Sequence, residues 1–248
     1  MGIEKKLVKI IQNNICGLIP CAGKGSRSGL DYPKTLYVID RKPILNHITD
    51  LLLNFTNNLS IIINPTQKKI FDKNIKKLKK NINVLFQKKP LGMGNAIISS
   101  EKYIIQFDHV LLIWGDVPFI KYKTVKKLIK THLENKNDFT FVTTFTKNPY
   151  TYIKRDSNNN LLSVVETRET NFKLDYAERD IGLFLFKPEI ILKYLKMNLK
   201  NKMGRKTKEH GFLYIIEHLI KKNHKIEALN IANESETRTL NKISDLKL

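Results

Sequence analysis

The chain has 248 residues, of which 42% are hydrophobic and 27% charged, so it can bury a substantial core as one large domain or two small ones. No apolar run approaches the roughly 20 residues of a membrane helix, and residues 1–10 lack a secretory signal, so we expect a cytoplasmic protein with no membrane partner. The net charge of +21 would suit a nucleic-acid partner, but the lysines are spread over every predicted helix without an aromatic-interleaved stripe, so none is expected.

The first predicted element is a buried strand over residues 15–20, which runs into the turn Ala22-Gly23-Lys24-Gly25-Ser26-Arg27. Successive amide N–H groups in a glycine-rich turn form a concavity suited to phosphate oxygens. Arg27 adds a planar fork of donors, and Lys34, restrained by the preceding Pro33, adds a point charge. We therefore predict a nucleotide-phosphate loop. An ordinary glycine-rich turn with incidental cations is the alternative.

Strands and helices then alternate up to residue 145. The pattern predicts strands over 59–63, 82–86, 109–114 and 139–145, and helices over 44–52, 67–80, the Gly92 loop to about 105, and 123–133. Pro43 opens the first of these helices after a turn over 40–43, and Thr66 is the expected N-cap of the second. Such alternation predicts a mainly parallel sheet with helices on both faces, and ligands bind beyond the carboxyl ends of such strands.

The second half of the chain has a different pattern. A hairpin is predicted from strands over 150–155 and 161–166. A strand over 181–186 and a helix over 188–197 follow it. The chain then continues as a mobile basic loop over 198–208, an amphipathic segment over 211–222 and a last strand over 226–231. No repeat or linker divides the chain. We therefore predict a single domain over residues 1–248.

One carboxylate stands at a strand end. Asp116 follows an apolar strand in W-G-D-V-P, where a carboxylate suits a hard cation such as Mg²⁺ and Gly115 allows close approach of a ligand. An aspartate in this position is otherwise a turn former or a helix cap. The two cysteines, Cys16 and Cys21, match neither a zinc pattern nor a disulfide framework, and packing is their expected role.

The phosphate loop is neither a Walker P-loop nor a G-x-G-x-x-G dinucleotide loop. It resembles L-A-A-G-x-G-[ST]-R-M followed by P-K, the signature of sugar-1-phosphate nucleotidyltransferases, and departs from it at Pro20 and Ser28. The resemblance implies a three-layer Rossmann-like nucleotidyltransferase fold of the α/β class. It also implies catalytic roles for Arg27 and Lys34, and nucleotide contacts from Pro20, Cys21, Ala22, Gly23, Lys24, Gly25 and Ser26.

Downstream motifs resemble bacterial N-acetylglucosamine-1-phosphate uridylyltransferases more closely. Q-K-K-P-L-G-M-G-N-A is similar to that family's Q-x-x-x-L-G-T-G-H-A, which implies uracil recognition by Gln87 and Gly92. Met93, where the family has threonine, is expected to contact the nucleotide as well, and Asn95 replaces the family's histidine.

Further resemblances concern the sugar and the metal. V-V-E-T-R, E-R-D-I-G-L-F and Y-T-Y-I-K-R are similar to family motifs at the sugar, with Asp180 in place of asparagine and Thr151 in place of glycine. L-N-K resembles the family's V-N-x, whose asparagine joins the aspartate at the metal. The implied sugar contacts are Gly115, Thr151, Glu166 and Asp180, and the implied Mg²⁺ ligands are Asp116 and Asn241.

The resemblance covers about residues 15–246 and implies a nucleotide-binding half over 15–145 and a sugar-binding half over 146–248. The implied reaction joins a nucleoside triphosphate, expected to be UTP, to a hexose or N-acetylhexosamine 1-phosphate with release of pyrophosphate. The hexapeptide repeats of the bifunctional enzymes are not present, so no acetyl transfer is expected.

Three alternatives remain from the sequence. A cytidylyl- or thymidylyltransferase would keep the fold and use another sugar phosphate or a non-sugar acceptor. A glycosyltransferase commonly carries Asp-x-Asp, which the chain lacks. A nucleic-acid binder is the non-enzyme alternative, and strongly salt-dependent retention of oligonucleotides would support it.

Overall fold

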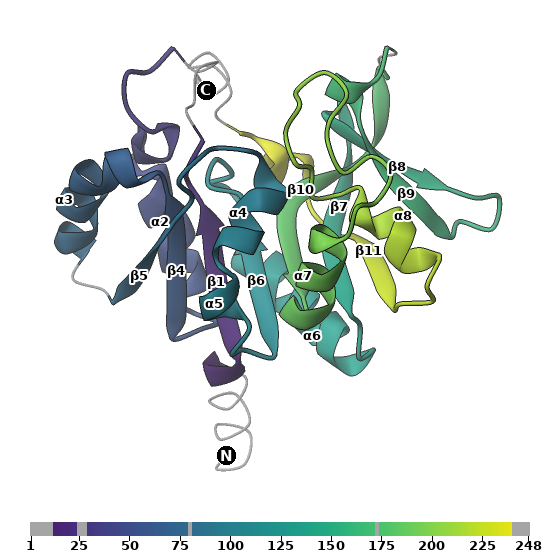
Figure 1. Cartoon of the computed structure of the whole chain (residues 1–248), viewed down its shortest axis with the longest axis horizontal. Coiled ribbons are helices and arrows are strands. Elements are labelled where there is room, and N and C mark those ends of the chain that lie inside the picture. Colours follow the sequence, from purple (N-terminus) through teal and green to yellow (C-terminus); the bar gives the residue numbers. More distant parts are fainter. Residues whose placement is uncertain (1–11, 24–28, 79–80, 172–173, 240–248) are drawn as a thin grey trace.

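The computed structural model describes residues 12–23, 29–78, 81–171 and 174–239 (Figure 1). Its centre is a seven-stranded sheet in the order β11-β7-β10-β6-β1-β4-β5. The strands are β1 (Ile15–Pro20), β4 (Asn58–Ile63), β5 (Ile82–Phe86), β6 (His109–Ile113), β7 (Phe139–Lys147), β10 (Tyr176–Phe186) and β11 (Ile226–Asn230). Only β10 runs antiparallel to its neighbours, so the predicted mainly parallel mixed sheet is confirmed.

Helices cover both faces of the sheet, which gives the three layers expected. Side chains of α2 (Ile44–Leu52), α3 (Lys68–Leu78) and α6 (Tyr122–Glu134) pack in one buried cluster. Those of α4 (Met93–Ser99), α5 (Glu101–Ile104), α7 (Pro188–Lys196) and α8 (Ile215–Ile220) pack in the other. Because a sheet strand points alternate side chains to its two faces, β1 contributes Ile15 and Ile19 to the first cluster and Cys16 and Leu18 to the second.

Smaller elements lie around this core. The predicted hairpin is β8 (Thr151–Arg155) paired with β9 (Leu161–Glu166), and Ile153 and Val164 bury it against the second cluster. The turn expected over 40–43 is shorter than predicted: Asp40 and Arg41, both at positive φ, form it, and Lys42 and Pro43 belong to the short strand β3 (Lys42–Pro43), which pairs with β2 (Val38–Ile39). Because β10 lies between β6 and β7, the two sequence halves share one continuous sheet.

Two helix predictions need correction. Asn64, not Thr66, caps the segment before α3: its side chain accepts the Thr66 N–H at 2.9 Å, and a 3₁₀ turn over Pro65–Gln67 precedes the α-helix. The helix expected to continue to about residue 105 is divided at Ser100, whose hydroxyl donates to the Ile97 carbonyl at 2.7 Å. Side-chain hydrogen bonds to the backbone compete with helix continuation, and hydrophobic periodicity does not report them.

Two further elements differ in length from the prediction. β10 begins at Tyr176, five residues before the predicted strand, because Glu178, Arg179 and Asp180 are buried in the sheet despite their charge. The amphipathic segment over 211–222 forms an α-helix only over Ile215–Ile220. Among the residues described, no helix combines the length and apolar character that crossing a bilayer requires.

Candidate active site

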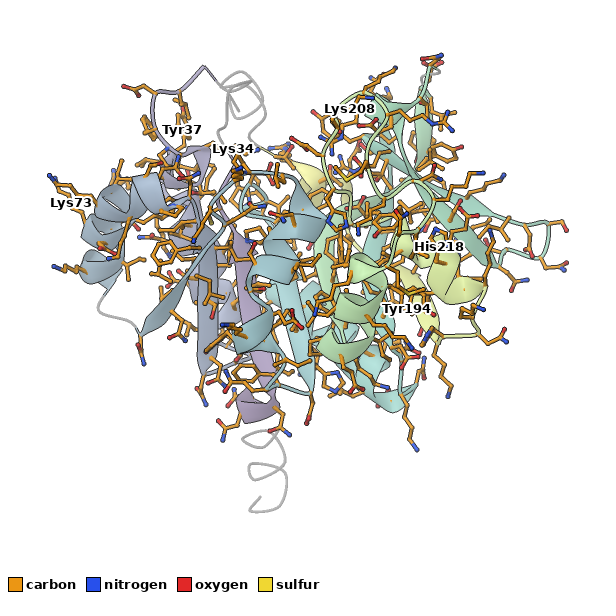
Figure 2. The ribbon with its side chains drawn as sticks, in the orientation of Figure 1. Lys34, Tyr37, Lys73, Tyr194, Lys208 and His218 are labelled. Atoms are coloured by element: carbon orange, nitrogen blue, oxygen red, sulfur yellow. The ribbon has the colours of Figure 1, made fainter. Side chains whose placement is uncertain are left out.

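The site lies at the carboxyl edge of the sheet, where the loops after β1, β5 and β6 meet. Lys34 begins the 3₁₀ turn η2 (Lys34–Leu36), and Asp116 stands in the turn after β6. Their side chains form an ion pair between Lys34 Nζ and Asp116 Oδ2. Both remain partly open, at 22% and 17% exposure, and Figure 2 shows Lys34 at the upper end of the sheet. The sequence predicted a role for each residue, and the structure brings them together.

Close packing joins the loops on either side of this pair. A Cβ atom on Gly115 would lie 2.7 Å from the Pro20 carbonyl oxygen and 2.9 Å from Thr35 Cγ2, so a side chain is excluded there. Gly115 therefore lets the turn that carries Asp116 lie directly against the loop after β1. The sugar contact expected of Gly115 stays a prediction.

The start of the phosphate loop is anchored to the sheet. Cys21 donates its N–H to the Ile62 carbonyl at 2.7 Å, and Cys21 and Ala22 are both 3% exposed. Burial raises the pKa of both the Cys21 and Cys16 thiols to about 12, so they remain protonated and pack as small apolar groups. At Gly23 a Cβ atom would meet nothing within 4 Å, so this backbone faces open space.

Several predicted site residues lie outside the described residues. They are the nucleotide contacts Lys24, Gly25 and Ser26, the catalytic residue Arg27 and the metal ligand Asn241.

Gln87 stands at the end of β5, in the loop predicted to recognise the base. Its side chain is held in one orientation, because Nε2 donates to the Gly92 carbonyl at 3.0 Å and to Asn95 Oδ1 at 2.9 Å. Asn95, which stands where the resembling family has histidine, is therefore a direct partner of Gln87. Base recognition by Gln87, Gly92 and Met93 stays a prediction.

The glycine loop packs on a segment far along the chain that sequence reasoning missed. His210 donates its N–H to the Leu91 carbonyl at 2.7 Å, and its own carbonyl accepts the Gly94 N–H at 3.1 Å. A Cβ atom placed on Gly92 would lie 2.4 Å from the His210 carbonyl oxygen. A Cβ atom placed on Gly94 would lie 2.2 Å from the Gly211 carbonyl oxygen. The two glycines signal a close approach in the sequence, but nothing there identifies its partner.

His210 itself is a neutral packing residue. It is 6% exposed, and burial, assisted by the charge of Lys202, lowers its pKa to about 4. Its Nε2 lies 3.3 Å from the Tyr214 hydroxyl. The imidazole is therefore uncharged at neutral pH and stabilises the contact between the glycine loop and the segment before α8.

Thr151 and Asp180, the two departures in the sugar motifs, are bonded to each other. The Thr151 hydroxyl donates to Asp180 Oδ1, and the Gly182 N–H donates to Oδ2 at 3.0 Å. Burial raises the pKa of Asp180 above its usual value, although Arg179 and these hydrogen bonds act in the opposite direction. Thr151 is 4% exposed and Asp180 is 0% exposed. The Thr151 hydroxyl, where the family has glycine, therefore provides a hydrogen bond to the buried Asp180 carboxyl, where the family has asparagine. Direct sugar contact by either stays a prediction.

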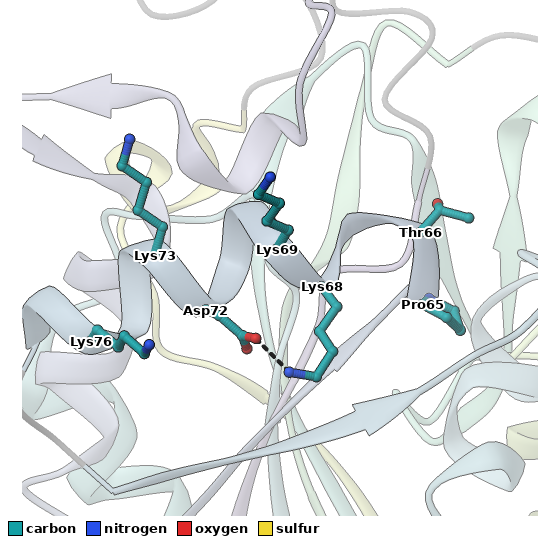
Figure 3. Close-up of a pocket in the computed structure, with 7 residues that line it drawn as sticks. All are labelled: Pro65, Thr66, Lys68, Lys69, Asp72, Lys73 and Lys76. Carbon is teal, nitrogen blue, oxygen red and sulfur yellow. Dashed lines mark hydrogen bonds and ion pairs between the residues drawn. The ribbon is translucent and has the colours of Figure 1, made fainter.

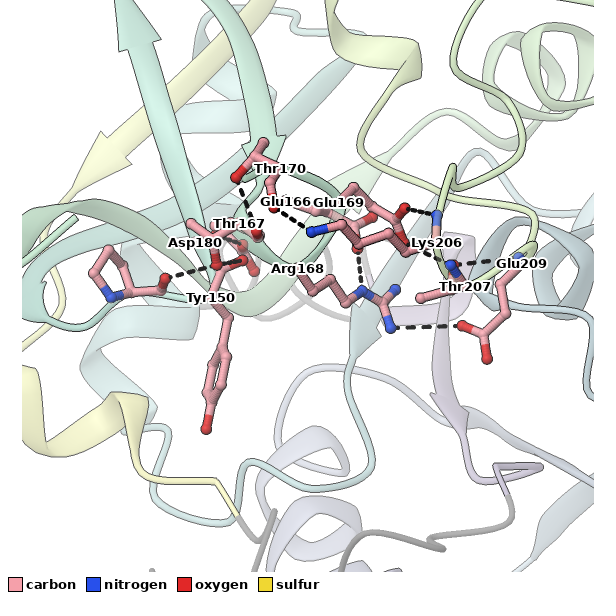
Figure 4. A network of polar contacts seen from close by, with 12 residues as sticks. Tyr150, Glu166, Thr167, Arg168, Glu169, Thr170, Asp180, Lys206, Thr207 and Glu209 are labelled. Atoms are coloured by element: carbon pink, nitrogen blue, oxygen red, sulfur yellow. Dashed lines mark hydrogen bonds and ion pairs between the residues drawn. The ribbon is translucent and has the colours of Figure 1, made fainter. Parts of the chain in front are cut away.

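Glu166, at the end of β9, is held by the arginine two residues later. Arg168 donates from Nε to Glu166 Oε2 at 2.7 Å, and its Nη1 lies 3.6 Å from Glu209 Oε2 (Figure 4). The Glu166 side chain remains 22% exposed, so it is oriented and still accessible. Arg168 and Glu209 are a second pair of residues that sequence reasoning did not single out.

A shallow hollow along α3 lies elsewhere. It is lined by Pro65, Thr66, Lys68, Lys69, Asp72, Lys73 and Lys76 (Figure 3). Asp72 is paired with Lys68, and Lys73 points outward, away from Lys34 (Figure 2). This is the solvated lysine face expected of that helix, so it adds nothing to the site.

The chain matches known proteins over most of its length. The family model described as "Nucleotidyl transferase" matches residues 17–233. The chain is 31% identical to bifunctional protein GlmU of Clostridioides difficile over 195 residues, which are 77% of this chain and 42% of that protein. It is 29% identical to GlmU of Buchnera aphidicola over 236 residues, which are 92% of this chain and 50% of that protein. The chain thus spans half or less of the length of these relatives.

Solved structures share the fold. A putative glucose-1-phosphate thymidylyltransferase from Bacillus anthracis superposes with a TM-score of 0.71 at 16% identity, covering 88% of this chain and 87% of that one. HddC from Yersinia pseudotuberculosis superposes with a TM-score of 0.66 at 19% identity, covering 92% and 95%. Taken with the family match over residues 17–233, the Rossmann-like sheet places this chain in the nucleotidyl transferase family.

Proposed function

We propose that this protein transfers a nucleotidyl group from a nucleoside triphosphate to a sugar 1-phosphate and releases pyrophosphate. UTP and a hexose or N-acetylhexosamine 1-phosphate are the substrates we favour. The observation that carries the proposal is the partly exposed pair of Lys34 and Asp116 at the carboxyl edge of the sheet. It combines a phosphate-binding cation with a metal-binding carboxylate at the place where such sheets bind ligands.

In this reaction an oxygen of the sugar phosphate attacks the α-phosphorus of the triphosphate, and the bond from that phosphorus to the bridging oxygen of pyrophosphate breaks. Catalysis of this kind needs positioning and neutralisation of charge rather than a covalent nucleophile. Lys34 would bind the phosphate oxygens at the reacting phosphorus, and Arg27 those of the leaving pyrophosphate. When phosphates occupy the site, they would compete with Asp116 for the Lys34 ammonium.

Mg²⁺ is the cofactor we propose, and the residues present fit it. Asp116 offers carboxylate oxygens, the ligand type that Mg²⁺ prefers, and its side chain is partly open. No group of three or more His, Cys, Asp or Glu side chains that could hold a metal ion occurs among the described residues. This agrees with an ion held by one or two protein ligands, here Asp116 and Asn241, together with substrate phosphates. Bound there, Mg²⁺ would neutralise phosphate charge and orient the two substrates.

The relatives named GlmU and the motifs around Gln87 and Glu166 support UTP and an N-acetylhexosamine 1-phosphate. A thymidylyl- or cytidylyltransferase is the second candidate, and a specific observation favours it. The base loop differs from the resembling family at Met93 and Asn95, and Asn95 is bonded to Gln87, the residue expected to contact the base. The sugar motifs differ at Thr151 and Asp180, which are bonded to each other, and this favours another sugar phosphate.

Pyrophosphate release tests the proposal directly. The purified protein is assayed with Mg²⁺ over a grid of UTP, CTP, dTTP, ATP and GTP against several sugar 1-phosphates, with EDTA as the matched control. We expect release with UTP and an N-acetylhexosamine 1-phosphate, and none with EDTA. Release with dTTP or CTP alone would favour the second candidate. No pyrophosphate release with any pair of substrates would contradict sugar-phosphate transfer.

A further inference from the structure

Arg168 lies among three carboxylates that come from two segments of the chain. Its Nε bonds Glu166 at the end of β9, and its Nη1 faces Glu209, which immediately precedes His210. Glu169, one residue beyond Arg168, accepts the backbone N–H of Lys206 at 2.7 Å. The turn after β9 is thus attached to the segment over 204–211 through side chains of both signs (Figure 4).

The same segment contacts the glycine loop on its other side. His210 exchanges two backbone hydrogen bonds with that loop, through Leu91 and Gly94. The Gly204 N–H donates to the Glu209 carbonyl at 2.9 Å, and the Gly211 N–H donates to the Lys202 carbonyl at 2.9 Å, so the 204–211 segment lies within one turn closed between Lys202 and Gly211. Glu209 and His210 are adjacent in the chain. The contacts to Arg168 and to the glycine loop therefore come from neighbouring backbone units.

We propose that Arg168 is a positioning residue that orients Glu166 for the sugar and, through Glu209, holds the 204–211 segment against the glycine loop. This inference rests on the proposed function and deepens it. It assigns to Arg168 a link between the two substrate subsites, with no direct contact to the reacting atoms. Glu169 also joins the turn after β9 to the 204–211 segment, through the backbone N–H groups of Lys206 and Thr207. The Arg168–Glu209 pair is the contact that connects this segment to Glu166 itself.

Charge gives the link a second consequence. Glu166 has to accept sugar hydroxyls beside an anionic phosphate, and Glu209 adds a second carboxylate on the other side of Arg168, while Arg205 and Lys206 lie beside Glu169. Arg168 offsets this charge, and the carboxylates keep its pKa above the usual value although burial alone would lower it. A substitution without charge both releases Glu166 and leaves the Glu166 and Glu209 carboxylates without their arginine partner.

The link contributes little to folding stability, because Arg168 and Glu209 are 42% and 44% exposed and exposed ion pairs are weak. Variants are therefore expected to fold.

We compare Arg168→Gln, Arg168→Lys, Glu209→Gln and the double variant R168Q/E209Q. The control is Arg205→Gln, which removes the same charge from an exposed arginine of the same segment.

We expect R168Q to raise the KM for the sugar 1-phosphate about tenfold with kcat within about threefold, and R205Q to match wild type. E209Q should raise the same KM by less, and the double variant should not exceed R168Q, because both changes break one link. R168K should recover only part of the loss, since an ammonium cannot span both carboxylates. A wild-type KM in R168Q, or full recovery in R168K, overturns the proposal.

Hydrogen exchange at the Gly94 amide provides a readout that needs no substrate. That N–H is bonded to the His210 carbonyl, so R168Q and E209Q should accelerate its exchange while R205Q leaves it unchanged. Equal exchange in all variants overturns the link even if KM changes. A wild-type protein that turns over no sugar 1-phosphate contradicts the proposed function alone, and the exchange result then decides the link by itself.

Discussion

The two edges of the seven-stranded sheet hold similar side chains that differ in how many protein partners they have. At the amino edge, His132 is fully buried, with Nδ1 2.8 Å from Thr140 Oγ1 and Nε2 3.2 Å from His109 Nδ1. Asp138, at the same edge, accepts from Lys187 at 2.8 Å and lies 3.0 Å from His224 Nδ1. At the carboxyl edge, Lys34 and Asp116 are partly exposed and pair only with each other among the described residues.

The difference separates stabilising polar groups from those available to a ligand. Inside the amino edge each titratable group has protein partners on several sides, so a ligand could only disrupt them. Asp138 and Lys187 are 15% and 31% exposed, so exposure alone does not distinguish the edges, but Asp138 has three partners. At the carboxyl edge Lys34 and Asp116 have only each other among the described residues, so substrate phosphates and a cation can replace the pair without leaving either charge buried and unpaired. Substitutions at the two edges should therefore differ in what they damage.

The largest expected effect is on turnover at the carboxyl edge. Lys34→Ala and Asp116→Ala should each lower kcat/KM by about 10²–10³-fold or more, because each removes a charge that acts on the reacting phosphates. The free energy of unfolding should change by less than about 1 kcal/mol, since the pair is partly exposed. Steady-state pyrophosphate release and urea denaturation measure the two effects.

Lys42→Ala is the matched control, because Lys42 and Asp50 form another partly exposed pair, outside the proposed site. It should keep wild-type turnover. Activity within tenfold of wild type in both K34A and D116A would contradict the site assignment.

Gly94→Ala should destabilise the contact that supports the carboxyl edge. Its Cβ atom would lie 2.2 Å from the Gly211 carbonyl oxygen, so the glycine loop or the 204–211 segment has to move, at a cost of about 1–3 kcal/mol. Helix propensity alone would favour alanine by about 1 kcal/mol, so a net loss isolates the clash. Gly23→Ala, where the new atom meets nothing within 4 Å, is the stability control. Equal unfolding free energies for the two variants would refute the packing argument.

Lowering the pH should reduce the free energy of unfolding through His132 at the amino edge. Burial, with the charges of His109 and Lys187, lowers the pKa of His132 from 6.5 to about 3. Between these values the unfolded chain binds a proton at His132 that the folded protein does not. This contribution is therefore complete above pH 6.5 and declines as the pH falls, by at most about 1.4 kcal/mol per pH unit.

His132→Asn keeps a polar group near Thr140 and removes this titration. Urea denaturation at pH 7, 6 and 5 should show a shallower loss of stability with acid than in wild type. His109 and His210 also have lowered pKa values and should retain the remaining slope. An unchanged slope in H132N would show that His132 is not kept neutral in the folded state.

The smallest effect is expected at an exposed ion pair that belongs to neither edge. Lys221→Ala removes the i,i+4 partner of Glu217, and both side chains are open to solvent, at 64% and 39% exposure. Unfolding free energy should fall by no more than about 0.5 kcal/mol, and less in high salt. A loss above 1 kcal/mol would mean that surface pairs in this lysine-rich chain matter more than their exposure implies.

Local pattern was sufficient for most of the architecture. The apolar runs of β1, β4 and β6 and the amphipathic spacing of α2 and α6 predicted element type, because these elements are defined by burial of their own side chains. The alternation of strands and helices predicted the mainly parallel sheet. Pattern failed where polar contacts decide: at the cap Asn64, at the break Ser100, and in the charged first half of β10.

The candidate site divides in the same way. The amino-acid sequence alone predicted the residue types of the site: a glycine loop and a strand end mark Lys34 and Asp116, and the motif resemblance adds Gln87 and Glu166. Only the tertiary structure decided their partners: Asp116 for Lys34, Arg168 and Glu209 around Glu166, and His210 beneath the glycine loop. The physical reason is that a partner is chosen by proximity in the folded sheet. Residues distant in the sequence carry no local signal of that proximity.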